Sequence, residues 1–113
     1  MINKSETEEI EKYKRSINET ENKIDFEKRR IKDIENLQEE VVSLNKNLDE
    51  CIKILEKSMQ GPTTNYAFED MHNNNRTFFV KTTSVLDEQI KNSQKKINSL
   101  SEKKEEQIKT NNN

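Results

Sequence analysis

The stretch Gly61-Pro62-Thr63-Thr64 contains the only glycine and the only proline in a chain of 113 residues. Glycine is common directly after the end of a helix, and a proline that follows closely cannot continue that helix. The scarcity of both residues elsewhere favours long, uninterrupted helices on either side of this stretch. We therefore expect a hairpin turn at residues 60–64.

Helix ends are predicted outward from this turn. Ser5 and Glu8 match the S-x-x-E capping box that often begins a helix. We expect a first helix over about residues 6–59, a second over about 65–109, and a polar tail at 110–113. The whole chain would then be one single helical hairpin.

The apolar residues of the first half recur in steps of three and four, which is the pattern of a coiled-coil seam, the row of residues that faces a neighbouring helix. Two consecutive steps of three end at Leu37 and form a stammer, which overwinds a helix locally. Thr20 and Glu27 occupy seam positions and weaken the seam there. The predicted seam residues are Ile10, Tyr13, Ile17, Ile24, Ile31, Ile34, Leu37, Val41, Leu44, Leu48, Cys51 and Leu55.

The second half shows the same spacing, with Ser93 as a polar interruption. The stretch Asn73-Asn74-Asn75 has the weakest helical tendency, and a break there stays open. The predicted seam residues are Phe68, Met71, Phe78 or Phe79, Leu86, Ile90, Ser93, Ile97 and Leu100.

The two seams match each other in reverse order. In an antiparallel hairpin the numbers of facing residues have a nearly constant sum, and these pairs satisfy that condition: Leu44 with Phe79, Leu37 with Leu86, Ile34 with Ile90, Ile24 with Leu100, Leu55 with Phe68, and Ile52 with Met71. The sequence therefore predicts an all-α fold, a long antiparallel two-helix hairpin of the coiled-coil type. Residues before about Lys14 should overhang the shorter second helix.

Composition excludes several classes of protein. Apolar residues make up 28% of the chain and charged residues 37%, whereas globular domains have about 45–50% and about 25%. Such a chain fills narrow seams rather than a thick core. The net charge of −2 disfavours nucleic acid as a partner. The cluster Lys28-Arg29-Arg30 is flanked by acids and is interpreted as a solvated helix face.

No apolar stretch approaches the roughly 18 residues of a membrane span, so we expect no membrane insertion. Residues 1–11 are acidic and lack an apolar centre, which a secretory signal peptide requires. We expect a cytoplasmic protein. Export, if it occurs, would use a route without a cleaved signal peptide.

Candidate catalytic groups are few. Cys51 is the only cysteine and His72 the only histidine, and the hairpin register brings them close enough for a Cys–His pair. The seam spacing instead favours Cys51 as a small core residue with His72 on the flank. Metal-ligand spacing and a glycine-rich phosphate loop are both missing from the sequence. We predict a protein that is not an enzyme and uses no cofactor or metal.

Surplus apolar residues predict an interface. Apolar side chains at positions 51, 52, 54 and 55 cover more than one helix stripe, whereas a two-helix hairpin buries only one seam. Exposed apolar patches of this kind mark protein–protein contacts. A locally broader core with a kinked second helix is the alternative. The predicted partner interface comprises Leu48, Ile52, Ile54, Leu55, Phe68, Met71, Phe78, Phe79 and Leu86.

Four segments support a family resemblance: the charged stretch Glu27-Lys28-Arg29-Arg30-Ile31, the turn after Leu55-Glu56-Lys57, the aromatic segment at 66–79 and the helix at 86–108. With them the chain resembles WXG-type helical hairpins, and more closely the small helical partners of LXG toxins in Gram-positive type VII secretion. The resemblance implies a non-catalytic targeting factor or chaperone. Its partner would be the helical toxin domain, alone or with a second small helical protein in one heteromeric complex.

The chain departs from that family in two features. It has no tryptophan, so a W-x-G turn is missing. Tyr66 to Asp70 reads Y-x-x-x-D, which is similar to a type VII export signal, but such signals usually follow the second helix and this one lies at its start. The alternative function is a self-associating structural coiled coil, in which two hairpins form a homodimeric four-helix bundle.

Overall fold

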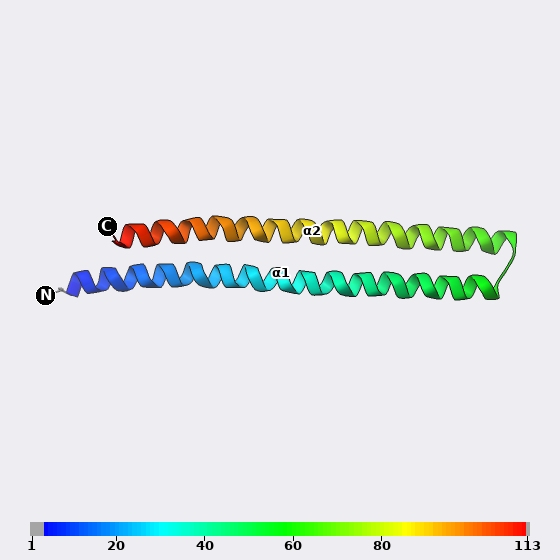
Figure 1. Ribbon diagram of the computed structural model, residues 1–113, viewed down its shortest axis with the longest axis horizontal. Helices are drawn as coiled ribbons and strands as arrows, with labels where there is room; N and C mark the ends of the chain where they lie inside the picture. The colour runs from blue at the N-terminus through cyan, green and yellow to red at the C-terminus, as the bar shows by residue number, and fades with distance from the viewer. Residues whose placement is uncertain (1–3, 113) are drawn as a thin grey trace. The chain divides into compact units, whose positions relative to one another are not determined.

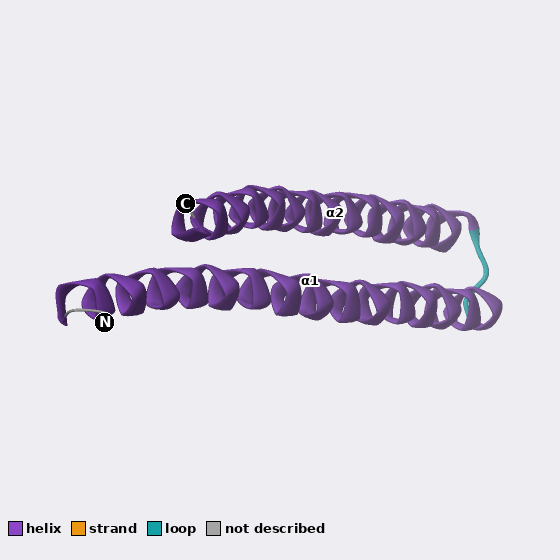
Figure 2. Ribbon diagram, turned by 60° about the vertical axis from the view of Figure 1, so that its left-hand side comes forward, coloured by secondary structure: helices purple, strands orange, loops and turns teal. Residues whose placement is uncertain are grey.

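The protein is all-α, and two helices contain nearly all of the residues that the structure describes. A computed structural model describes residues 4–112, in which α1 spans Lys4–Ser58 and α2 spans Pro62–Asn112. The helices run antiparallel, and a short connection at residues 59–61 joins them (Figures 1 and 2). No strand occurs in the described range. The predicted fold class is therefore confirmed.

The helix ends differ from the expected ones by a few residues. α1 already begins at Lys4, so Ser5 lies inside the helix and does not cap it. α2 begins at Pro62, three residues earlier than expected, because proline has a fixed φ that suits the first position of a helix. α2 also continues through residues 110–112, where we expected a polar tail. Asn113 lies outside the described residues.

Gly61 has a different role from the predicted one. Its carbonyl oxygen accepts hydrogen bonds from the backbone N–H of Asn65 and from Thr64 Oγ1, each at 2.9 Å. Gly61 does not have a positive φ, so it is not the left-handed residue that ends many helices. It caps the start of α2 instead of terminating α1.

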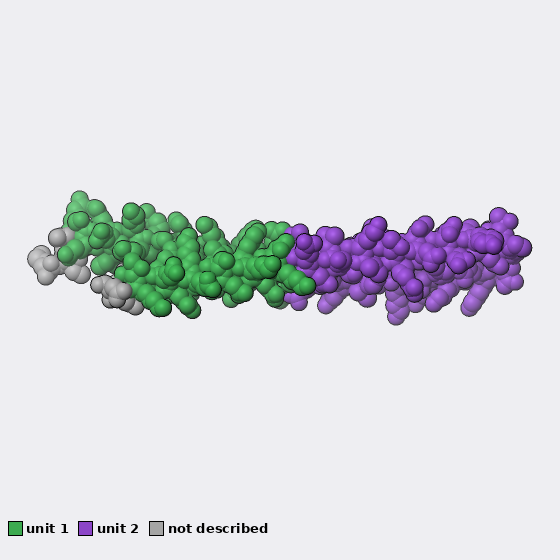
Figure 3. Space-filling model, turned by 90° about the horizontal axis from the view of Figure 1, so that it is seen from above, with its two compact units in different colours: residues 1–32, 90–113 green, residues 33–89 purple. Residues whose placement is uncertain are grey.

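The chain forms two compact units, which Figure 3 colours separately. Unit 1 comprises residues 1–32 and 90–113, and unit 2 comprises residues 33–89. Unit 1 thus pairs the first part of α1 with the last part of α2. Unit 2 pairs the remaining parts and contains the connection between them.

Unit 1 is held by an isoleucine-rich seam with small polar residues at its centre. Ile24 is buried, and Thr20 and Ser93 are each only 2% exposed. Glu27 is also buried, so the polar seam positions predicted at Thr20, Glu27 and Ser93 are confirmed. Half-buried residues complete this seam: Ile17, Ile31, Ile90, Ile97 and Leu100.

Polar contacts across unit 1 support the predicted register. Thr20 Oγ1 lies 3.1 Å from both the Ser16 carbonyl oxygen and Gln107 Oε1. Gln107 Nε2 in turn donates a hydrogen bond of 2.8 Å to Ser16 Oγ. Lys104 Nζ lies 3.1 Å from Glu21 Oε1. The contact between Thr20 and the Ser16 carbonyl lies within α1, whereas the other three join residues of the two helices whose numbers approach the constant sum of the antiparallel register.

Unit 2 has a seam that alternates apolar and polar residues. Phe68 is 5% exposed, and Ile52 is likewise buried. The remaining seam positions are half-buried: Gln38, Val41, Asn45, Asp49 and Glu56 on α1, and His72, Asn75, Phe79, Thr82 and Leu86 on α2. Gln38 Nε2 donates a 2.7 Å hydrogen bond to Asp87 Oδ1, and Asn75 Nδ2 donates a 3.3 Å bond to the backbone carbonyl of Asn45.

The rotational phase of α1 in unit 2 corrects the sequence prediction. Its seam passes from Ile34 to Gln38 in a step of four, so the stammer that would bring Leu37 inward does not form. Leu37 and Leu44 are exposed, although each directly precedes a seam residue. α2 also continues without a break through Asn73-Asn74-Asn75. The pairing of the two helices is close to the expected register, as the contacts of Gln38 with Asp87 and of Asn75 with Asn45 indicate. Leu37 and Leu44, however, are rotated about a quarter-turn away from the seam.

Candidate protein-binding surface

A row of exposed apolar residues follows both helices of unit 2. Their exposed fractions run from 43% for Leu48 to 60% for Phe78, and Cys51 is exposed among them. We define the apolar face as Leu37, Leu44, Leu48, Cys51 and Leu55 of α1 with Met71, Phe78 and Val85 of α2. The α1 members, together with the half-buried Val41, recur in steps of four and three, which is the spacing of a coiled-coil seam.

The two rows lie on the same side of unit 2. Every member of the apolar face directly precedes a residue of the interhelical seam, as Leu44 precedes Asn45 and Phe78 precedes Phe79. One residue corresponds to a rotation of about 100° around a helix. Antiparallel helices are related by an approximate twofold axis normal to the plane that contains them. The apolar row is offset from the seam by the same angle and in the same sense on both helices. Because the twofold axis preserves the side of the plane, both apolar rows lie on the same side of the hairpin.

The opposite flank of unit 2 is polar. A groove of about 690 Å³ opens there beside the seam, and its lining includes Lys53, Asn73 and Arg76. The exposed valines of this flank, Val42 and Val80, directly follow seam residues and are 52% and 56% exposed. Of the twelve large apolar residues exposed in unit 2, seven lie on the apolar face and two, Val42 and Val80, on this opposite flank.

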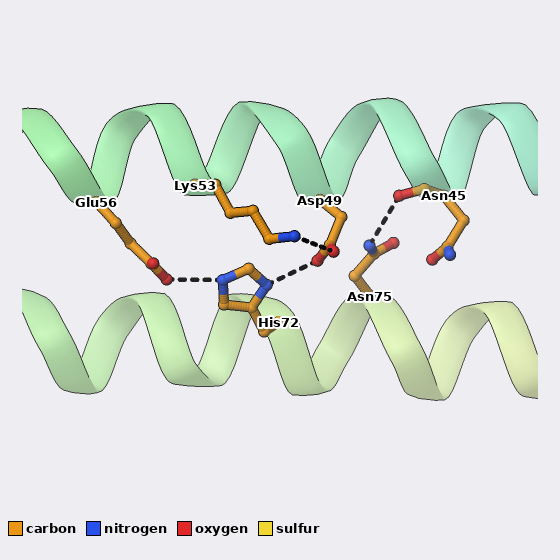
Figure 4. A network of polar contacts seen from close by, with 6 residues as sticks. All are labelled: Asn45, Asp49, Lys53, Glu56, His72 and Asn75. Atoms are coloured by element: carbon orange, nitrogen blue, oxygen red, sulfur yellow. Dashed lines mark hydrogen bonds and ion pairs between the residues drawn. The ribbon is translucent and has the colours of Figure 1, made fainter.

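Cys51 and His72 have exchanged the environments that the sequence predicted. Cys51 is exposed on the apolar face, so its interpretation as a small core residue is wrong. His72 lies in the seam between two carboxylates: its Nδ1 is 2.8 Å from Asp49 Oδ1, and its Nε2 is 2.6 Å from Glu56 Oε1 (Figure 4). Lys53 Nζ approaches the other oxygen of Asp49 at 3.6 Å.

This arrangement favours a protonated imidazole. Both ring nitrogens face carboxylate oxygens, which only accept hydrogen bonds, so both contacts are formed only when each nitrogen carries a proton. The hydrogen bond with Asp49 raises the pKa of His72 above its ordinary 6.5, partial burial opposes that rise, and Glu56 adds to it. The hydrogen bond with His72 lowers the pKa of Asp49 below its ordinary 3.8. The network therefore ties the two helices together by charge, and Cys51 takes no part in it.

The predicted interface residues separate into three groups. Leu48, Leu55, Met71 and Phe78 belong to the apolar face, and Ile54 is exposed farther around α1. Ile52 and Phe68 are buried between the helices, which corrects their prediction as partner-contacting residues. Phe79 and Leu86 are half-buried in the seam. Sequence reasoning missed Leu37, Leu44, Cys51 and Val85 as members of this surface because it assigned the first three to the core and did not consider Val85.

Other kinds of site find little support in the described range. Among residues 4–112, no three His, Cys, Asp or Glu side chains are grouped in a way that would hold a metal ion. No described helix is long and apolar enough to cross a membrane. Lys28, Arg29 and Arg30 are exposed, as expected for a solvated helix face.

Comparison with known proteins adds no family assignment. No protein-family model, no curated protein and no solved structure matches this chain.

Proposed function

We propose that this protein is a non-catalytic binding partner whose apolar face receives a helical segment of another protein. One observation carries the proposal: unit 2 leaves leucine and phenylalanine side chains exposed on one flank while polar residues alternate with apolar ones in its own seam. Because the exposed residues repeat at coiled-coil spacing, a helix is the secondary structure that packs best against them.

Energetics support the need for a partner. Burying a leucine, valine, methionine or phenylalanine side chain stabilises by roughly 1.5–3 kcal/mol relative to leaving it in water. Residues such as Leu44 and Phe78 gain only part of this stabilisation within the described hairpin because they are 52% and 60% exposed. A helix laid along the apolar face would gain it for several residues at once and would complete a bundle of three or more helices.

The biological setting that we propose follows from the family resemblance. In that setting the partner is the helical domain of an LXG toxin, and the protein assists the targeting of the toxin to type VII secretion. The charged helices, the central turn and the apolar segment at residues 66–79 are compatible with this role. The specific toxin partner rests on the resemblance, whereas the helical nature of the partner rests on the apolar face.

Co-purification of the full chain with a toxin's LXG domain, encoded beside it, tests this function. The face variant carries Leu44→Gln, Leu48→Gln and Phe78→Gln, and its matched control carries Val42→Gln and Val80→Gln on the opposite flank. We expect the wild type and the control to retain the toxin domain and the face variant to lose it. Retention by the folded face variant would contradict the proposed binding surface.

A further inference from the structure

We infer that the occupant of the apolar face is a basic amphipathic helix from a different protein, not a second copy of this chain. The inference rests on the proposed function and adds the charge of the partner. It follows from the distribution of charge between the two units and around the apolar face.

Unit 2 is acidic although the whole chain is nearly neutral. Residues 33–89 contain eleven Asp and Glu against five Lys and Arg, a net charge of −6 with His72 counted as neutral and −5 with the protonated His72 that its two carboxylate contacts favour. The whole chain carries −2. A helix that lies along unit 2 therefore experiences a negative field, which favours a positively charged partner and disfavours a negatively charged one.

The border of the apolar face is also mainly acidic. Asp33 lies four residues before Leu37, Glu40 lies four before Leu44, and all of these side chains are exposed. On α2, Glu88 follows Val85 by three residues. Residues three or four apart are neighbours on a helix surface, so these acids border the face. Lys81, four residues before Val85, is a basic residue on the same border.

A second copy fits this face poorly. Placing two apolar faces against each other would oppose two units that each carry a net charge of −5 or −6. Unit 1 of a second copy would not repel unit 2 electrostatically, but the described residues of its corresponding flank form no row of apolar side chains to pack against the apolar face. The corresponding flank of unit 1 carries Lys23, Lys96 and Lys103, and Phe26 is its one large exposed apolar residue between residues 16 and 32.

Two synthetic helical peptides test the charge of the occupant. Both are about four heptads long with identical leucine seams, and they differ only in having lysine or glutamate beside the seam. The full chain is incubated with each peptide, and the rate at which iodoacetamide alkylates Cys51 reports occupation of the face, because Cys51 is the only cysteine and is exposed there. Anisotropy of labelled peptide gives the affinity.

We expect the lysine peptide to bind at least about tenfold more tightly than the glutamate peptide at low salt and to slow alkylation of Cys51. The Leu44→Gln, Leu48→Gln, Phe78→Gln variant should lose this binding, and the Val42→Gln, Val80→Gln control should keep it. Equal protection by both peptides would overturn the charge inference while supporting a helix-binding face. Binding without protection, or no binding by either peptide, would overturn the proposed function itself. Homodimerisation that shields Cys51 without peptide would overturn the heterologous occupant.

Discussion

Unit 1 and unit 2 contain parts of the same two antiparallel helices but distribute their apolar residues differently. In unit 1, isoleucines such as Ile24 occupy the seam, and lysines such as Lys23 lie on the flank. In unit 2, the seam includes Asp49 and His72, and leucines such as Leu48 occupy the flank. Unit 1 buries or half-buries most of its described apolar side chains between its own helices, whereas unit 2 exposes a row of apolar side chains on one flank.

The difference suggests separate tasks for the two seams. Polar contacts such as His72 with Asp49 and Glu56 require specific partners, so they favour one pairing of the helices over neighbouring registers. A seam that is defined in this way leaves the leucines of unit 2 available for another helix. Each of the following substitutions tests one side of this comparison.

The largest expected effect is a loss of folding stability when a seam residue of unit 2, but not a residue of its apolar face, is truncated. Phe68 is buried between the helices and Phe78 is exposed. Phe68→Ala should lower the free energy of unfolding by about 3–5 kcal/mol, the usual cost for a buried phenylalanine. Phe78→Ala should change it by no more than about 0.5 kcal/mol, as at most surface sites. Urea denaturation measures the free energy of unfolding of both variants. If both substitutions lowered it equally, Phe68 would not be more buried than Phe78, and the rotation of α2 about its axis would be wrong.

The next effect concerns Glu27, the one buried carboxylate among the described residues of unit 1. Glu27 Oε2 accepts no hydrogen bond from the described residues, and Lys96 Nζ approaches Oε1 only to 3.9 Å. Replacing a buried ion pair with well-packed apolar residues is often neutral or stabilising by about 1–4 kcal/mol, and Glu27 has only this weak contact with the exposed Lys96 to lose. Glu27→Leu should therefore raise the melting temperature. A lower melting temperature would mean that Glu27 contributes more to pairing than its contacts indicate.

Most of the fold was predictable from the sequence, but the sequence did not reveal which stripe of α1 faces α2 in unit 2. The single turn and the antiparallel register followed from Pro62 and from matching periodicities. α1 carries two stripes offset by one residue in unit 2, one through Leu44 and one through Asn45, and hydrophobicity favours the leucine stripe. The structure places Asn45 and Asp49 inward, where the backbone carbonyl of Asn45 accepts a hydrogen bond from Asn75 and the Asp49 carboxylate contacts His72. Such a preference depends on pairs across two helices, which periodicity along one helix does not reveal.

A smaller effect is expected from pH, and it belongs to unit 2 because His72 is the only histidine. Its pKa is raised in the folded state, so its contribution is fully present below about pH 6.5 and is lost as pH rises through the higher folded value. The pKa of Asp49 is lowered, so its contribution is present above about pH 3.8 and is lost as pH falls through the lower folded value. Stability from this network should therefore be greatest between these limits.

Urea midpoints at about pH 5 and about pH 8 measure this dependence. Wild type should lose stability toward the higher pH, and His72→Gln should flatten that part of the profile. An unchanged slope in the variant would assign the dependence to other groups.

The smallest effect is expected at the basic cluster of unit 1. Lys28 and Arg29 are exposed, and substitutions at exposed sites usually change stability by no more than about 0.5 kcal/mol. The double variant Lys28→Gln, Arg29→Gln should therefore retain both its thermal midpoint and its binding to a helical partner. Loss of partner binding in this folded variant would move the binding surface from unit 2 to unit 1.

Sedimentation equilibrium tests the central claim most directly, because that claim assigns the apolar face of unit 2 to a helix of a different protein. The purified chain should remain a monomer as its concentration is raised, and it should form a heteromer when the partner's helical domain is added. The Leu44→Gln, Leu48→Gln, Phe78→Gln variant should remain a monomer in both experiments. A stable wild-type homodimer that these three substitutions dissociate would contradict the claim, because the face would then receive a second copy of the same chain.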